Sequence, residues 1–192
     1  MKVKLGARGL NNLEFSFFTV KNMNHIETER LILSEFSLDD APFILEMLND
    51  PGWLKFIGDR GVKSLEDAQD YIANKLQKGF KEQGFGMLLV KLKGSETSIG
   101  TCGLLKREYL DDMDIGFAFL PAFRGKGYAF EAATAVIEDG KERLRINRFL
   151  AFTDAKNDAS ISLITKLGLE FERLMTDFPE DDTEIRLYGK GL

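Results

Sequence analysis

Residues 119–140 read FLPAFRGKGYAFEAATAVIEDG, and in this stretch two glycines flank a lysine where an apolar segment gives way to a helical pattern. The pattern predicts a strand, a turn and then a helix from about Tyr128 to Arg143. Successive free N–H groups at a helix N-terminus form an anion cradle, and glycines allow a phosphate to approach the backbone closely. The stretch therefore indicates a phosphate site at the start of a helix.

The spacing of the glycines separates the known kinds of phosphate site. A Walker A loop needs a Lys-Ser/Thr pair after its last glycine, but here Lys126 lies between the two glycines. A dinucleotide-binding fingerprint needs a third glycine where this chain has Phe130. What remains is an R-G-x-G-x-A loop, Arg124-Gly125-Lys126-Gly127-Tyr128-Ala129, whose two cations add charge at the cradle. The alternative is a glycine turn with solvated cations.

Periodicity elsewhere predicts seven strands and four helices in one domain. The strands are expected at 30–36, 85–92, 98–107, 113–120, 148–153, 169–175 and 183–189. The helices are expected at about 39–48, 64–80, 128–143 and 157–167. Pro51-Gly52 is expected to end the first helix, and Ser64 with Asp67 to form a capping box at the second. The order β-α-α-β-β-β-α-β-α-β-β predicts an α/β domain with a mixed sheet.

Composition excludes several classes of function. The net charge of −5 argues against a nucleic-acid partner, which needs a surplus of clustered Lys and Arg. No apolar run approaches the roughly 20 residues that span a bilayer, so no membrane partner is expected. Residues 1–22 are basic and lack a cleavage site, so they are interpreted as an N-terminal appendage of a cytoplasmic protein. The domain is then expected over residues 23–192.

The chain has one histidine, His25, and one cysteine, Cys102. These two residues cannot supply an ordinary zinc site, so no metal is expected. A nucleophile activated by histidine is also improbable. Cys102 is interpreted as a small buried hydrophobe. Any chemistry must therefore proceed without imidazole.

At the glycine loop the chain resembles the GNAT acetyltransferases, and within them the Rim-type group that acetylates N-terminal amines. The resemblance covers residues 26–189 and rests on ETERLIL, LNDP, IGTCGL, DIGFAFLPAFRGKGYAFEA and NDASISLITKLGLEFE. It implies a GNAT fold, with a mixed, mostly antiparallel sheet of about seven strands that is splayed in the middle and flanked by about four helices. It also implies that Arg124 to Ala129 bind the pyrophosphate of acetyl-CoA.

The resemblance further implies how the rest of the cosubstrate is held. Pantetheine would pair with the exposed backbone of Phe117-Ala118-Phe119, like an added strand. The side chains of Phe117 and Phe119 are open to a second interpretation as core aromatics. Asn157 would bond the cosubstrate and cap the last helix, and capping alone is the alternative.

Catalytic groups are less defined by the resemblance. Many family members place a tyrosine acid where this chain has Ile164. Rim-type members carry an N-x-x-S pattern, matched by Asn157 and Ser160, so Ser160 is the candidate acid and a first-turn helix serine the alternative. Asp114 is the candidate base, with a solvated hairpin residue as the alternative, while Glu35 and Glu108 are weaker candidates.

A few residues outside these motifs also receive roles. Glu131 is expected to order the helix near the loop. Trp53 and Phe56 either wall the acceptor pocket or pack in the core. Two acidic clusters, Asp111-Asp112-Asp114 and Glu180-Asp181-Asp182-Glu184, would attract a cationic amine or are solvated loops.

The implied activity is transfer of an acetyl group from acetyl-CoA to a primary amine, by direct attack with both substrates bound. The amine is expected at a peptide N-terminus or, alternatively, on a small molecule such as a polyamine or aminoglycoside. A non-catalytic acetyl-CoA-binding module is the alternative from another class. The protein is expected to be a monomer or a homodimer.

Overall fold

The structure, a computed structural model, describes residues 25–175 and 184–192. The expected appendage, residues 1–22, lies outside these ranges, and so do the three acidic residues at 180–182. Within the described ranges, no helix has the length and apolar character that a membrane crossing requires.

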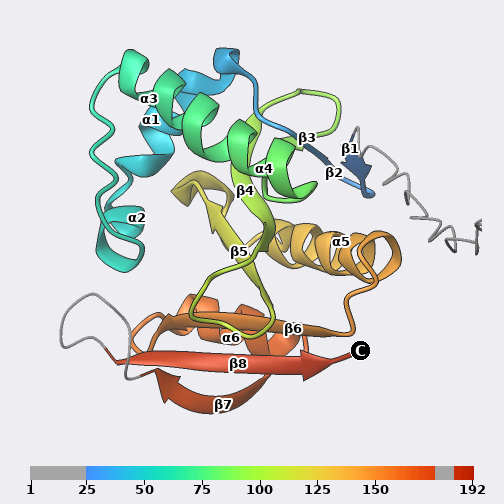
Figure 1. The fold of residues 1–192 in the computed structure, drawn as a ribbon. Helices are drawn as coiled ribbons and strands as arrows, with labels where there is room; N and C mark the ends of the chain where they lie inside the picture. The colour runs from blue at the N-terminus through green and yellow to red at the C-terminus, as the bar shows by residue number, and fades with distance from the viewer. Residues whose placement is uncertain (1–24, 176–183) are drawn as a thin grey trace, which may run out of the picture.

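In the described residues, a single eight-stranded sheet organises the fold, in the order β1-β2-β3-β4-β5-β6-β8-β7 (Figure 1). The strands are β1 (His25–Glu27), β2 (Leu31–Ser34), β3 (Met87–Leu92), β4 (Ser98–Leu105), β5 (Met113–Phe119), β6 (Arg148–Asp154), β7 (Glu170–Met175) and β8 (Ile185–Gly191). The expectation of about seven strands falls one short, because β1 is a three-residue strand that pairs with β2. All neighbouring strands are antiparallel except β5 and β6.

The helices are α1 (Ala41–Leu48), α2 (Pro51–Phe56), α3 (Leu65–Tyr71), α4 (Lys78–Gln83), α5 (Tyr128–Arg143) and α6 (Asp158–Lys166). Short 3-10 turns, Leu38–Asp40 and Pro121–Phe123, precede α1 and α5 respectively, and a π-helical segment, Ile72–Gln77, joins α3 to α4. The first helix ends before Pro51-Gly52 as expected, because α1 stops at Leu48, but a second helix begins at once. Asp50 caps a new helix there by accepting a hydrogen bond from Trp53 N–H, and proline is tolerated at a first helical position.

Among the described residues, two of the three hydrophobic cores lie on opposite faces of the sheet, and the third is a small one formed mainly by β6, β7 and β8. Successive strand residues point to opposite faces, and in β3 Leu88 and Val90 join one core while Leu89 joins the other. The first core includes the inner sides of α5 and α6, and the second includes those of α1 and α3. The helices thus cover both faces, as the α/β prediction requires.

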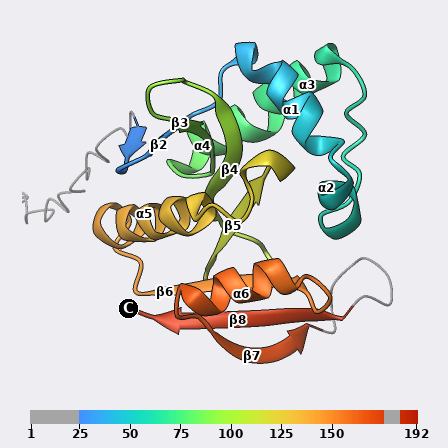
Figure 2. The same cartoon turned by 180° about the vertical axis from the view of Figure 1, so that it is seen from behind.

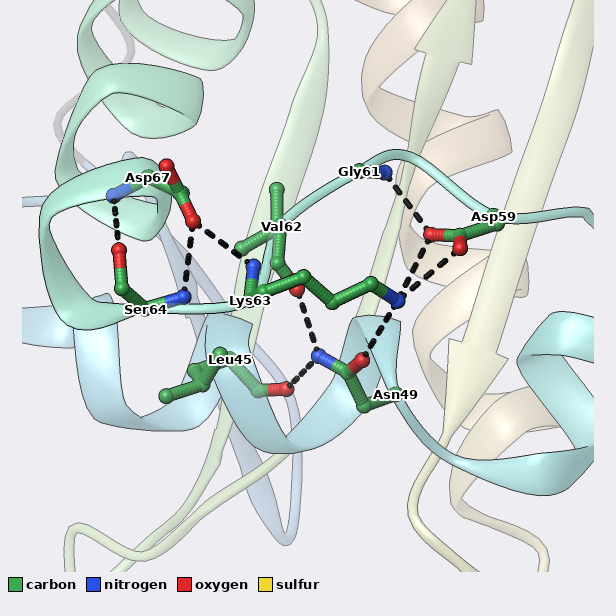
Figure 3. A network of polar contacts seen from close by, with 8 residues as sticks. All are labelled: Leu45, Asn49, Asp59, Gly61, Val62, Lys63, Ser64 and Asp67. Carbon is green, nitrogen blue, oxygen red and sulfur yellow. Dashed lines mark hydrogen bonds and ion pairs between the residues drawn. The ribbon is translucent and has the colours of Figure 1, made fainter.

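The connection from α2 to α3 is held by a polar network (Figure 3). The side-chain amide of Asn49, just after α1, donates to the carbonyls of Leu45 and Val62 at 2.8 and 2.9 Å. Lys63 Nζ donates to Asn49 Oδ1 at 3.2 Å and pairs with Asp59 at 3.0 Å. The network fixes this loop against α1, and with it the placement of α2.

Strands β5 and β6 are paired only at their beginnings. Their parallel register contains two pairs, Met113 with Phe149 and Asp114 with Leu150. Beyond Asp114, β5 follows β4 up to Phe119 while β6 follows β8. Figures 1 and 2 show the two strands diverging at a steep angle, with α5 beside one and α6 beside the other. The expected splay in the middle of the sheet is confirmed.

Candidate functional site

The glycine loop lies between the end of β5 and the first turn of α5. Gly125 and Gly127 have φ of +72° and +82°, a region that residues with a side chain rarely adopt. A Cβ at Gly125 would meet nothing within 4 Å. The sequence Gly-Lys-Gly thus lets the chain reverse tightly and leaves the loop backbone exposed to solvent.

The N-terminus of α5 is open to an anion. Gly127 is its N-cap residue and offers no side chain to cap the helix. In the part of the chain that the structure describes, the N–H groups from Gly125 to Phe130 have no recorded acceptor. These donors and the positive end of the helix dipole make a site that fits a phosphate group.

The edge of β5 facing β6 offers further backbone groups. Leu120 N–H bonds to Ile99 of β4, so by alternation Ala118 also faces β4. The backbone groups of Phe117 and Phe119 then face the splay, where β5 has no strand partner beyond Asp114. Such an edge is able to accept an extended ligand as an added strand. Phe119 is buried in the core and Phe117 is partly buried against the same core, so both side chains contribute to packing.

Arg124 is turned away from the loop that it begins. Its Nε donates to the Phe119 carbonyl at 2.7 Å, and its Nη2 pairs with Asp50 at 2.6 Å. Burial acts to raise the pKa of Asp50, but the bonds from Arg124 and Trp53 outweigh it and lower that pKa. Arg124 therefore ties the end of β5 to the start of α2, across 74 positions of sequence.

Glu131 in the first turn of α5 is bonded to the segment before β2. It accepts hydrogen bonds from Thr28 Oγ1 at 2.6 Å, Arg30 N at 2.8 Å and Arg30 Nε at 2.6 Å. Burial acts to raise the pKa of Glu131, but these donors outweigh it and hold the pKa below its ordinary value. The expected role of Glu131 in ordering the helix near the loop agrees with these contacts.

Asp114 is buried at the point where β5 and β6 separate. Its side chain is 3% exposed and pairs with Arg107 Nε at 2.9 Å. Burial raises the pKa of Asp114 and outweighs the opposing effect of Arg107. The interpretation of Asp114 as a solvated hairpin residue is therefore excluded. Its carboxylate lies at the base of the splay, and Asp114 stays the candidate base. Glu35 and Glu108 are both exposed.

Asn157 and Ser160 lie together at the start of α6. Asn157 is the N-cap residue, and its Oδ1 accepts a hydrogen bond from Ser160 N–H at 3.2 Å. Both side chains are half-buried. Ile164, one turn later, is 1% exposed and belongs to the core, so it contributes packing at the position where a tyrosine would offer a hydroxyl.

Trp53 borders a small apolar cavity on the α1–α3 side of the sheet. The cavity has a volume of about 30 Å³ and is lined by Phe36, Ile44, Met47, Leu48, Trp53, Tyr71, Leu76, Met87 and Thr101. The indole Nε1 of Trp53 is buried and has no partner among the described residues. Phe56 is not part of this lining. Met87 reaches the centre of the sheet, since its sulfur would lie 3.3 Å from a Cβ at Gly116.

The first acidic cluster is largely neutralised. Asp112 pairs with Arg148 at 2.8 Å, and Asp114 pairs with Arg107. These ion pairs weaken the case that residues 111–114 attract a cationic amine. No group of three or more His, Cys, Asp or Glu side chains within the described ranges is placed to hold a metal ion. Cys102 is fully buried and burial raises its pKa, as expected of a core residue.

The sequence interpretation missed Arg30 and Asp50. Arg30 contacts the loop from the segment before β2, and Asp50 holds Arg124 from the start of α2. Both lie in motifs quoted for the resemblance, ETERLIL and LNDP, but no local periodicity connects them to a loop about 75 to 100 positions away.

Comparisons with known proteins show the family of this chain. A sequence model described as "Acetyltransferase (GNAT) domain" matches residues 30–170. An uncharacterized N-acetyltransferase of Bacillus subtilis, YnaD, is 32% identical over 148 residues, which cover 77% of this chain and 84% of that protein.

Two solved structures share the fold. An acetyltransferase of the GNAT family from Bacillus anthracis superposes with a TM-score of 0.74 at 25% identity, covering 87% of this chain and 98% of its own. RimL, a ribosomal alpha-N-protein acetyltransferase, in complex with coenzyme A, gives a TM-score of 0.75 at 18% identity, with 88% and 98% covered.

Proposed function

Because this chain belongs to the GNAT family of acetyltransferases, we propose that it transfers the acetyl group of acetyl-CoA to a primary amine while both substrates are bound. The divergence of β5 and β6 carries this proposal. It leaves an extended backbone edge that ends at the anion cradle of α5. An extended pantetheine arm attached to a pyrophosphate matches these two features in order.

Different residues of this chain bind different parts of acetyl-CoA. The backbone of Gly125 to Ala129 holds the pyrophosphate, and the edge of Phe117-Ala118-Phe119, through the outward-facing groups of Phe117 and Phe119, holds the pantetheine. Lys126 adds positive charge at the loop, while Arg124 acts chiefly by fixing the end of β5 through Phe119 and Asp50. Asn157 orders the start of α6 on the other side of the splay.

Acetyl-CoA supplies an acetyl thioester, whose C–S bond breaks as the nitrogen of the neutral amine forms the new C–N bond. The nitrogen loses one proton and the departing sulfur takes one up, so the products are the amide and the CoA thiol. Orientation of the two reactants accounts for much of the rate, since such preorganisation contributes about 7–11 kcal/mol in favourable cases. In this proposal Asp114 takes the proton from the amine, and Ser160 supplies one to the sulfur. Asp114 must exchange its bond to Arg107 for the amine in order to act.

We place the acceptor on the α1–α3 face of the sheet. By alternation along β5, Asp114, Gly116 and Ala118 all point to this face. Gly116 lies against Met87, which also lines the cavity beside Trp53. A peptide N-terminus is our first choice of acceptor, supported by the likeness in fold to RimL.

The test measures turnover of acetyl-CoA with each amine of a panel. The release of free thiol is the quantity that is monitored. The panel contains peptides with different N-terminal residues, polyamines and aminoglycosides. Turnover with peptides and retention of activity after blocking their lysine side chains supports the N-terminal assignment. Turnover only with polyamines or aminoglycosides would move the acceptor to small molecules, and slow thiol release with every amine would contradict an enzymatic role.

A further inference from the structure

Arg30 reaches the glycine loop from the segment between β1 and β2. Its Nη1 donates to the Lys126 carbonyl at 3.1 Å, inside the loop itself. Its guanidinium carbon lies 4.6 Å from the centre of the Tyr128 ring, in the first turn of α5. The side chain therefore touches both ends of the anion cradle.

Glu131 holds this guanidinium in place. Its carboxylate accepts hydrogen bonds from the Nε and the main-chain N–H of Arg30, and from the hydroxyl of Thr28. The Arg30 side chain is 43% exposed, whereas that of Glu131 is 17% exposed. The carboxylate is thus the enclosed half of the pair, and the guanidinium is the half that a ligand is able to reach.

The outer nitrogen of Arg30 faces the cradle. A Cβ added to Gly127 would lie 3.3 Å from Nη2, and no other heavy atom outside the adjoining residues would come within 4 Å. The hydrogen bonds recorded among the described residues use Nε, Nη1 and the main-chain N–H of Arg30, but not Nη2. This donor is directed at the space that an anion on Gly127 would enter.

The two cations within the loop are less well placed. The guanidinium of Arg124 pairs with Asp50 and donates a hydrogen bond to the Phe119 carbonyl. Lys126 Nζ lies 5.6 Å from the centre of the Phe123 ring, on a flexible chain. Guanidinium groups bind phosphate oxygens through a planar fork, which a lysine lacks.

We propose that Arg30 is a binding residue for the pyrophosphate of acetyl-CoA, and that Glu131 is the positioning residue that aims it. This inference rests on the proposed function, because it assumes that acetyl-CoA occupies the loop. It assigns the main side-chain charge of the site to a position outside the R-G-x-G-x-A motif.

The test compares Arg30→Ala with wild type by calorimetry and steady-state kinetics, using acetyl-CoA, acetyl-dephospho-CoA and acetyl-pantetheine. Loss of a charge-assisted contact should weaken binding of the first two about ten- to a hundredfold. The value of kcat with acetyl-CoA should stay at the wild-type level. The value of kcat/KM for acetyl-pantetheine should also stay there, because acetyl-pantetheine has no pyrophosphate. Glu131→Gln should shift acetyl-CoA affinity in the same direction by a smaller factor.

Arg173→Ala removes an equal charge from β7, at the far edge of the sheet, and serves as the matched control. An unchanged affinity for acetyl-CoA in folded Arg30→Ala would overturn the proposal, as would an equal loss with acetyl-pantetheine. A loss seen with acetyl-CoA but not with its dephospho form would overturn the assignment to the pyrophosphate. If Arg30→Ala does not fold, Arg30→Lys replaces it and must show a loss confined to the pyrophosphate-bearing thioesters. If wild type itself fails to bind acetyl-CoA, the proposed function fails first.

Discussion

At the scale of single residues, the chemical problem is a thiol that must leave without help from histidine or tyrosine. The only histidine, His25, lies on β1, and the buried Ile164 fills the position of the tyrosine acid. A thiol has a pKa of about 8.5, so the thiolate is a moderately poor leaving group at neutral pH. Assistance from an acid is therefore expected to be modest.

Ser160→Ala should lower kcat by about ten- to a hundredfold, which corresponds to roughly 1.4–2.7 kcal/mol. The affinity for acetyl-CoA should stay nearly constant, because Asn157 still caps α6 through the main-chain N–H of residue 160. Ser162→Ala, on the exposed side of the same helix, is the control. A folded Ser160→Ala protein with wild-type kcat, under conditions where chemistry limits the rate, would leave Ser160 as a helix-start residue only.

Asp114→Asn should remove an acidic limb from the pH profile of kcat. Burial raises the pKa of Asp114, so a base at this position gains activity as pH rises through a value above the usual figure of about 3.9. A raised pKa in the folded state also means that the stability contributed by the protonated group is lost over the same rise in pH. Asp112→Asn, at a more exposed ion pair, should keep the wild-type profile. A profile unaffected by Asp114→Asn would assign Asp114 to structure alone.

At the scale of elements, the free edge of β5 leads to a prediction that distinguishes the contribution of a backbone N–H from that of a side chain. Phe117→Pro removes one N–H that faces the splay, while the ladder to β4 uses its neighbours. Compared with Phe117→Ala, it should weaken acetyl-CoA binding further by about 0.5–1.5 kcal/mol, the net value of one hydrogen bond. Calorimetry on both variants measures the difference. Equal affinities would show that this N–H does not meet the pantetheine.

Helices α5 and α6 were predictable because their signals are local. Two glycines and an apolar stripe define the start and inner face of α5, and it spans Tyr128–Arg143 as expected. Asn157 caps α6, and Gly168 follows its end at φ of +83°. Caps and periodicity act over one or two turns, so the sequence displays them directly.

The region between α1 and β3 was predicted less well. The first helix ends before Pro51 as expected, but Pro51 also begins α2, a helix that the pattern did not indicate, because the Asp50 side chain caps it. Leu65, in the first turn of α3, is 51% exposed, whereas the capping box of Ser64 and Asp67 was confirmed. The π-helical segment Ile72–Gln77 changes the periodicity within one continuous helical stretch. A pattern read at 3.6 residues per turn cannot show such a change.

At the scale of the whole molecule, two long-range contacts join the loop to the rest of the fold. Arg30 with Glu131 ties it to the segment between β1 and β2, and Arg124 with Asp50 ties it to α2. The splay itself was expected only from the family resemblance, because strand pairing across β5 and β6 depends on tertiary packing. These contacts decide how the site is held, and neither leaves a local pattern in the sequence.

The central claim is that acetyl-CoA binds with its pyrophosphate on the Gly125–Ala129 backbone, and calorimetry of Gly127→Val tests it most directly. A β-branched side chain at φ of +82° would strain the loop and occupy the cradle. Gly94→Val, at φ of +84° with nothing within 4 Å of its Cβ, applies the same backbone strain in the turn after β3. The account predicts that Gly127→Val loses acetyl-CoA affinity by more than about tenfold while Gly94→Val keeps it. Wild-type affinity in a folded Gly127→Val protein would contradict the account.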